Sequence, residues 1–127
     1  MRNEALKHKI EDMSEAVESV FSKIIQGEIP ATIEFENERF IVIHDIAPAA
    51  PVHLLVIPKD AKYRDVVELA EQNPALLAEM VLIAKQQADR FSNGEFRLVF
   101  NTGEASGQTV FHVHGHILGN FDHKGIL

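Results

Sequence analysis

The chain has 127 residues, of which 46% are hydrophobic and 24% are charged, a composition typical of one globular domain. Its net charge of −7 argues against nucleic acids and anionic membranes as partners, because both require a basic surface. It contains no cysteine, which excludes disulfides and thiolate zinc sites. The charged N-terminus lacks the apolar core of a secretory signal, and we expect a soluble, cytoplasmic protein.

The first predicted element is helical. Hydrophobic residues recur every three or four positions over Leu6–Ile24, and Gly27 ends the pattern. A cap at Asp12 or Ser14 would divide this stretch into two helices.

Three strands are predicted next. Residues 33–35 and 40–44 flank a polar turn and predict a hairpin, and residues 52–58 predict a third strand that ends at a proline.

Residues 65–90 are predicted to be helical with one interruption. Asn73 is a capping residue and Pro74 suits a first helical position, so a short helix should precede a longer one. Asn93-Gly94 should end the longer helix. Its expected buried stripe is Leu77, Val81 (with Met80), Ala84, Ala88 and Phe91.

Two more strands, residues 95–101 and 108–118, complete the predicted chain, and the loop TGEASGQ joins them. The order α-β-β-β-α-β-β predicts an α+β protein, an antiparallel sheet of about five strands with a long helix packed on it.

The last of these strands contains VFHVHGHILG, in which His112, His114 and His116 stand two positions apart. Alternate residues of a strand project from one face, about 7 Å apart, so the three imidazoles should form a row. Val113, Gly115 and Ile117 would then face the other way and pack on a helix. Histidine titrates near neutral pH, which indicates proton, phosphate or metal chemistry.

The loop before the histidines carries Gly103, Gly107, Ser106 and Thr109. Successive backbone N–H groups in such a turn can bind an anion, and a phosphate held there would meet the imidazoles. An imidazole can then attack phosphorus while a neighbour gives a proton to the leaving group.

Two other interpretations remain open for the histidines. They can be structural, or two of them can be zinc ligands with a third residue nearby. A metal site usually has carboxylates beside its ligands, and no Asp or Glu interleaves here, so we predict no metal.

The sequence resembles the histidine triad family, whose motif is His-φ-His-φ-His-φ-φ with φ apolar. SVFSKIIQGEIPA, FIVIHDIAPAAPVHLLVIPK and VFNTGEASGQTVFHVHGHILG are similar, in order, to its HINT branch. The resemblance covers Ser19 to Gly119 and divides the chain into an N-terminal helical extension, residues 1–18, and a histidine triad domain, residues 19–127. It implies a homodimer that binds purine mononucleotides (AMP-like or GMP-like) and hydrolyses nucleoside 5′-phosphoramidates without a cofactor.

The resemblance also implies a role for particular residues. His114 would be the nucleophile, His116 would contact the phosphate and the leaving atom, and His112 with His53 would orient the nucleophile. Phosphate oxygens would be held by Asn101, Gly107, Gln108 and Thr109. The ribose hydroxyls would bind Asp45, and the base would be surrounded by Val20, Phe21, Ile24, Ile43 and Ile46. Phe21 and Ile24 can instead be plain core, and Asp45 a turn residue.

The sequence departs from the family at two places. Some members bind zinc through Cys-x-x-Cys, where this chain has Ser19-Val20-Phe21-Ser22. Gly115 stands where a bulky residue is usual, and we expect a helix to approach its bare backbone. Two alternative functions also remain, a dinucleoside polyphosphate hydrolase and a nucleotide-binding regulatory module.

Overall fold

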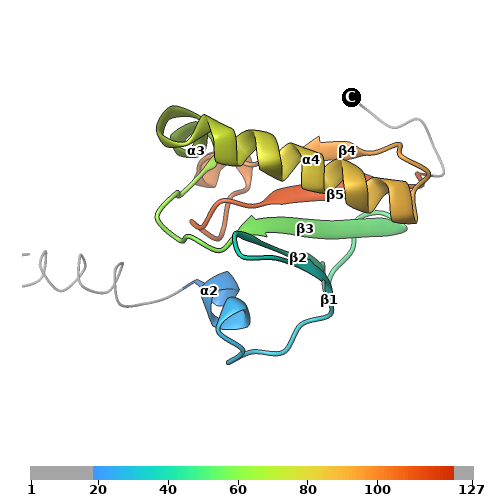
Figure 1. Cartoon of the computed structure of the whole chain (residues 1–127), viewed down its shortest axis with the longest axis horizontal. Coiled ribbons are helices and arrows are strands. Elements are labelled where there is room, and N and C mark those ends of the chain that lie inside the picture. The colour runs from blue at the N-terminus through green and yellow to red at the C-terminus, as the bar shows by residue number, and fades with distance from the viewer. Residues whose placement is uncertain (1–18, 122–127) are drawn as a thin grey trace, which may run out of the picture.

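The computed structural model describes residues 19–121, which form an antiparallel five-stranded sheet with helices on both of its faces (Figure 1). The strand order is β1-β2-β3-β5-β4, so β1 and β4 are the edges. The strands are β1 (Ile33–Glu36), β2 (Phe40–His44), β3 (Val52–Pro58), β4 (Arg97–Val99) and β5 (Gly115–Gly119). The helices are α2 (Val20–Ile25), α3 (Val66–Gln72), α4 (Pro74–Phe91) and the 3-10 turn η1 (Glu104–Ser106). The predicted α+β class and antiparallel sheet are confirmed.

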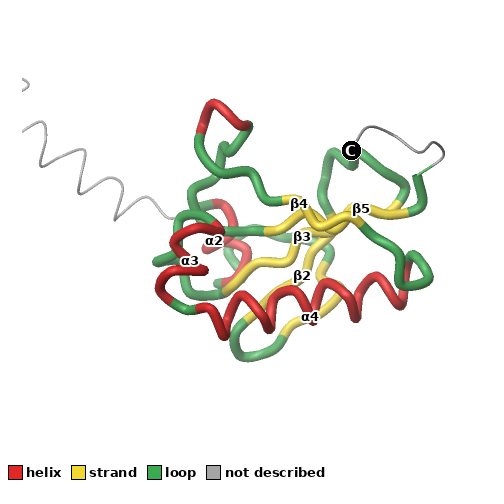
Figure 2. The backbone as a smooth tube through the Cα atoms, turned by 90° about the horizontal axis from the view of Figure 1, so that it is seen from above, coloured by secondary structure: helices red, strands yellow, loops and turns green. Residues whose placement is uncertain are grey.

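Local sequence explains how the helices begin and end. The side chain of Asn73 accepts a hydrogen bond from the N–H of Leu76, and Pro74 opens α4, as predicted. At its other end Asn93 and Gly94 have φ of 56° and 80°, a left-handed conformation that stops the helix. Figure 2 shows α4 running across the sheet.

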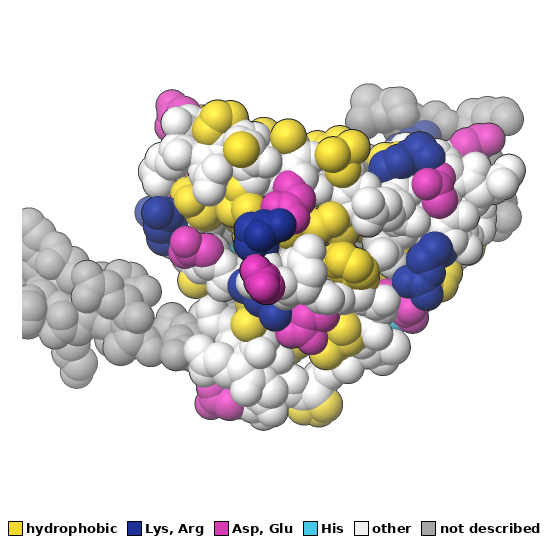
Figure 3. Space-filling model, in the orientation of Figure 1, with side chains coloured by type: hydrophobic (Ala, Val, Ile, Leu, Met, Phe, Trp, Pro, Cys, Tyr) yellow, Lys and Arg dark blue, Asp and Glu magenta, His cyan; other side chains and the backbone are white. Residues whose placement is uncertain are grey.

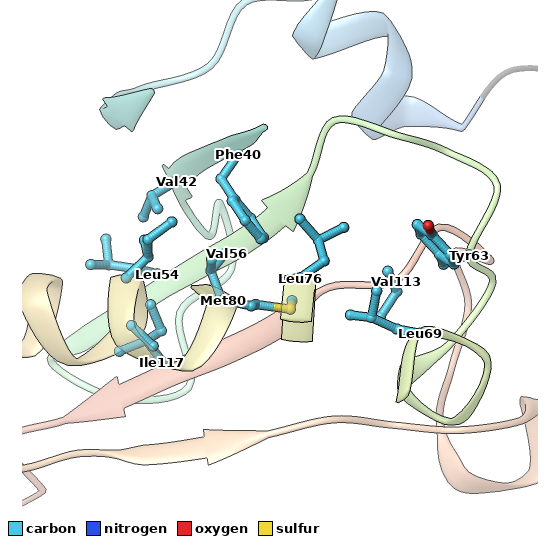
Figure 4. Close-up of a cluster of buried hydrophobic side chains, with 12 residues drawn as sticks. Phe40, Val42, Leu54, Val56, Tyr63, Leu69, Leu76, Met80, Val113 and Ile117 are labelled. Atoms are coloured by element: carbon cyan, nitrogen blue, oxygen red, sulfur yellow. The ribbon is translucent and has the colours of Figure 1, made fainter. Parts of the chain in front are cut away.

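The alternation of side chains gives the sheet two apolar faces. Phe40, Val42, Leu54 and Val56 pack toward α4, and Figure 4 shows Met80 reaching from α4 into this cluster. The intervening residues pack on the other face, where α2 lies. That second cluster contains Phe21, Ile41, Ile43, Leu55 and Ile57.

The buried stripe of α4 differs from the predicted one by about one position. Its buried residues are Leu76, Met80, Ile83, Ala84, Gln87 and Ala88. Val81, which we expected inside, is 41% exposed. Apolar residues predominate in both stripes, and only contact with the sheet selects the face that is buried.

The last two strands are shorter than predicted. The final strand was expected over residues 108–118 but begins at Gly115, so His112 and His114 precede it. Strand pairing explains the difference. The pairing of β3 with β5 stops at Val56, opposite Gly115, and the pairing of β4 with β5 stops at Val99, opposite His116.

The predicted N-terminal helical extension, residues 1–18, lies outside the described residues. Within residues 19–121, no helix has the length and apolarity that crossing a membrane would require.

Candidate active site

The histidines gather on the face of the sheet that α2 covers. Val113 and Ile117 pack in the opposite cluster, beneath α4, as the alternation predicted. Phe21 of α2 places its ring edge-on to His112 and His114, with centroids 5.9 and 4.8 Å away. The first helix and the histidine segment, far apart in sequence, therefore form one site.

His53 of β3 and His116 of β5 are diagonal neighbours across the sheet. His116 lies opposite Leu55, and His53 lies opposite Leu118. Their ring nitrogens, Nε2 of His53 and Nδ1 of His116, are 3.0 Å apart. The resemblance had implied that His53 orients His114, but its ring is bonded to His116 instead.

A backbone group fixes the tautomers of this pair. The N–H of Ala49 donates to Nδ1 of His53 at 2.9 Å, so a neutral His53 carries its proton on Nε2. That N–H donates to Nδ1 of His116, which leaves the proton of His116 on Nε2. His116 therefore has a donor available for a ligand.

His114 has the opposite tautomer. Its Nδ1 lies 2.8 Å from the carbonyl oxygen of His112, and a carbonyl can only accept, so Nδ1 carries the proton. The lone pair of His114 is consequently on Nε2, as a nucleophile requires. Its ring centroid is 5.2 Å from that of His116, so a ring with a free lone pair lies beside a ring with an available N–H.

His112 is buried and bonded at both nitrogens. Its Nε2 lies 2.6 Å from the carbonyl oxygen of Pro58, and its Nδ1 lies 2.9 Å from the hydroxyl of Ser19. The ring is held in place, and it is the backbone carbonyl of His112 that orients His114.

The environment keeps all four imidazoles neutral near neutral pH. Burial lowers the pKa of His112, His114 and His53. Burial, with the neighbouring rings of His114 and His53, lowers the pKa of His116 to about 4. A neutral ring has a lone pair with which to attack, and its N–H can donate a hydrogen bond to a leaving group.

The loop from Gly103 to Thr109 is fixed by internal hydrogen bonds that we did not predict. The N–H groups of Ser106, Gly107 and Gln108 donate to carbonyls within the loop, and that of Gly103 donates to Oε1 of Gln108. These four amides are therefore engaged within the loop, and whether the loop binds an anion stays a prediction.

Gln108 is 2% exposed, and its amide nitrogen donates to the carbonyls of Arg64 and Val110. Its side chain is used to fix the loop and leaves little capacity for a ligand. Asn101 lies beside Gly107, with 4.0 Å between its amide carbon and the Cβ position of that glycine. Thr109 is exposed.

The residues proposed to hold the nucleoside differ in exposure. Ile46 is fully exposed and Val20 is 41% exposed, whereas Phe21 and Ile43 are buried in the α2-side cluster and Ile24 packs against it. Asp45 lies beside the histidines, with its Oδ2 3.4 Å from Nε2 of His53, and its Oδ1 accepts from the N–H of Ala47. Asp45 is thus both a turn residue and a member of the site.

Asp45, His53 and His116 are close enough to hold a cation, since their ligand atoms lie within 4.8 Å of one another. The hydrogen bonding does not suit a metal. Ala49 makes Nδ1 of His53 an acceptor, so Nε2 keeps its proton and has no lone pair to offer. The cluster is better suited to holding a proton than a metal ion.

Sequence reasoning missed three contributors to the site: the N–H of Ala49, the carbonyl of Pro58 and the hydroxyl of Ser19. The first two are backbone groups, which no residue type reveals. Ser19 had a recognisable signal, because serine before an apolar run is a typical helix cap.

The family model described as scavenger mRNA decapping enzyme C-term binding matches residues 18–126. A HIT-like protein of Synechococcus elongatus, itself uncharacterized, is 44% identical over 103 residues, which are 80% of this chain and 90% of that protein. The chain belongs to the histidine triad (HIT) family.

Solved HIT structures share the fold. A HIT family hydrolase from Clostridium thermocellum is 45% identical with a TM-score of 0.78, and the match covers 86% of this chain and 95% of that one. Another, from Legionella pneumophila, is 41% identical with a TM-score of 0.75, covering 80% and 92%. These likenesses support a hydrolase in general terms.

Proposed function

We propose that this HIT protein is a nucleotidyl hydrolase that cleaves purine nucleoside 5′-phosphoramidates through a covalent intermediate on His114. The observation that carries the proposal is the pair of opposite tautomers. His114 offers a lone pair on Nε2, and His116, with its ring centroid 5.2 Å away, carries a proton on Nε2. One ring can attack while the other protonates the leaving atom.

In the first step Nε2 of His114 attacks phosphorus, and the bond from phosphorus to the leaving nitrogen breaks. The electron pair of that bond goes to the nitrogen, which takes the proton from Nε2 of His116 and leaves as a neutral amine. His116 becomes an imidazolate, whose negative charge is offset by the positive charge on His114 and stabilised by the N–H that His53 donates to it. The carbonyl of His112 accepts the Nδ1–H of His114 and stabilises the positive charge that develops on its ring.

In the second step a water molecule attacks the phosphorus of the nucleotidyl-His114 intermediate. Nε2 of His116, now without its proton, takes one from that water, and the bond to His114 breaks. The products are a nucleoside monophosphate and an enzyme restored to its starting protonation.

The remaining assignments concern binding. Asp45 would accept the ribose hydroxyls, and the base would lie against Val20, Phe21, Ile24, Ile43 and Ile46. Asn101 and Thr109 would donate to phosphate oxygens. We assign Gln108 and Gly107 the task of shaping the loop, because the amide of Gln108 is bonded within it and Gly107 has φ of 94°.

The need of the leaving group for a proton favours a phosphoramidate substrate over a dinucleoside polyphosphate. An amine leaving group needs a proton, whereas a phosphate leaves as a stable anion. The proton on His116 is therefore most useful for a phosphorus–nitrogen bond. A regulatory module that only binds nucleotides would not need these paired tautomers.

The test is release of nucleoside monophosphate from a panel of purine nucleoside phosphoramidates and dinucleoside polyphosphates, in buffer containing EDTA. We expect phosphoramidates to have the highest kcat/KM. His116→Ala should slow them by about a hundredfold or more, but should slow a nucleotide p-nitrophenyl ester much less, since nitrophenolate leaves without a proton. Equal losses on both substrates would contradict the role of His116, and negligible turnover of every substrate would favour a binding module.

A further inference from the structure

The hydroxyl of Ser19 connects the start of α2 with the histidine segment. Its oxygen accepts a hydrogen bond from the N–H of Ser22 at 3.0 Å, which caps the helix. The same hydroxyl lies 2.9 Å from Nδ1 of His112, 93 residues away in sequence. One side chain thus caps the start of α2 and also holds the histidine segment.

The direction of the second bond follows from the other side of the ring. The carbonyl of Pro58 accepts a hydrogen bond from the N–H at Nε2 of His112, so Nδ1 must accept. Ser19 is the nearer of two hydroxyls at that nitrogen, since Oγ of Ser22 lies 3.5 Å away. His112 is only 1% exposed, so a lost donor could not readily be replaced by bulk water.

The contact reaches the reacting atom through the backbone. The carbonyl of His112 accepts the Nδ1–H of His114 at 2.8 Å and so sets the direction in which the lone pair of His114 points. Moving or protonating the ring of His112 would disturb that carbonyl. Phe21, two residues after Ser19, also contacts both rings.

We propose that Ser19 is a positioning residue for catalysis, whose hydroxyl proton keeps His112 neutral and in register, and thereby aims the nucleophile. The inference rests on the proposed function of His114. The alternative is that Ser19 merely caps α2. These roles can be separated, because capping uses the lone pair of the hydroxyl and positioning uses its proton.

Substituting Ser19 by aspartate or by threonine separates the two roles. Both cap helices, but threonine keeps a hydroxyl proton, whereas the carboxylate of aspartate can only accept. In Ser19→Asp the carboxylate would face Nδ1 of His112 and favour a protonated ring, which would then donate at both nitrogens. The other ionisable groups that act on His112 are His114 and Asp60, and these variants leave both unchanged.

The experiment measures urea unfolding, kcat, KM and the ¹⁵N shifts of the histidine rings for Ser19→Thr, Ser19→Asp and Ser19→Ala. We expect Ser19→Thr to resemble the parent in all four. Ser19→Asp should keep its stability but lose about tenfold or more in kcat, with little change in KM and with His112 protonated to higher pH. Ser19→Ala should lose both stability and kcat. Asp65→Ala, which removes the cap of α3 away from the histidines, controls for capping alone.

Three results would overturn the proposal. The first is parental kcat in Ser19→Asp, and the second is an unchanged ¹⁵N shift of His112 in both Ser19→Ala and Ser19→Asp. A larger loss in Ser22→Ala than in Ser19→Ala would move the role to the second hydroxyl and also contradict it. The ring shifts are read without substrate, so they test Ser19 even if the proposed hydrolysis fails.

Discussion

Nε2 of His53 and Nδ1 of His116 lie 3.0 Å apart across the β3–β5 pair, and the N–H of Ala49 decides which nitrogen carries the shared proton. A backbone amide cannot release its proton at ordinary pH, so the order of donors and acceptors along this chain is fixed. His116 consequently presents a proton to the site rather than a lone pair.

This relationship predicts different outcomes for two substitutions of His53. In glutamine the side-chain amide can occupy the place of Nε2 and donate to His116, whereas leucine cannot donate. We expect His53→Leu to lower kcat by about a hundredfold and His53→Gln by about tenfold or less. Steady-state kinetics on a purine nucleoside phosphoramidate measure both, and equal losses would show that the hydrogen bond does not matter.

Replacing His114, the proposed nucleophile, should separate chemistry from binding. His114→Ala removes the attacking nitrogen but leaves Asp45 and the apolar residues near α2 in place. We expect kcat to fall by at least about a thousandfold while AMP binds with a similar Kd, measured by calorimetry. Smaller losses are expected for His112→Ala and His116→Ala, and near-normal kcat in His114→Ala would refute the assignment.

Stability should fall on mild acidification. The pKa of His116 is lowered from 6.5 to about 4, and those of His53, His112 and His114 are also lowered, mainly by burial. The unfolded chain therefore binds more protons between pH 6.5 and about 4, and the free energy of unfolding decreases as the pH falls through this window. Urea titrations should show this slope, and His116→Asn should make it shallower. A flat profile would mean that the rings are not held neutral.

Gly115 is crowded, although not by the helix we expected. A Cβ atom there would lie 3.0 Å from Cδ1 of Leu98 and 3.0 Å from Cε1 of Phe100, so β4 and the residue after it occupy the space. The cost of overpacking should exceed the gain from removing a strand glycine, and we expect Gly115→Ala to lower Tm by about 3 to 6 °C. The loss should shrink in a Leu98→Ala background, and a rise in Tm would contradict this account.

We predict that the protein is a homodimer, paired through α4 and the edge strand β4. Val81 and Leu82 of α4 are 41% and 63% exposed, and Figure 3 shows hydrophobic side chains along the upper edge of this face, where α4 runs. Pairing two β4 strands would also protect that edge of the sheet. Sedimentation should give twice the chain mass of 14.2 kDa. Leu82→Glu should weaken the dimer and Val67→Glu, on α3, should not; a monomer mass at all concentrations would exclude the dimer.

The sequence alone determined the elements whose signals are local. The cap at Asn73, the proline at the start of α4 and the stop at Asn93-Gly94 act within a few residues, and all three occur as predicted. The apolar, β-branched runs of β2 and β3 likewise need no distant partner to be recognised. The two-residue spacing of the histidines, with the blocks similar to HIT proteins, indicated the site.

Tertiary structure decided which of these patterns became strand and which nitrogens carry protons. The segment with His112 and His114 has the composition of a strand, but a strand requires a partner backbone, and pairing with β3 stops at Val56 opposite Gly115. The N–H of Val113 bonds to the carbonyl of Tyr63 instead. The tautomers depend on Ala49, which is four residues from His53, and on Pro58 and Ser19, which reach His112 only through tertiary packing from 54 and 93 residues away. Hydrogen bonds between segments distant in the chain leave no periodicity in a sequence, and for that reason only the folded structure reveals how these imidazoles can react.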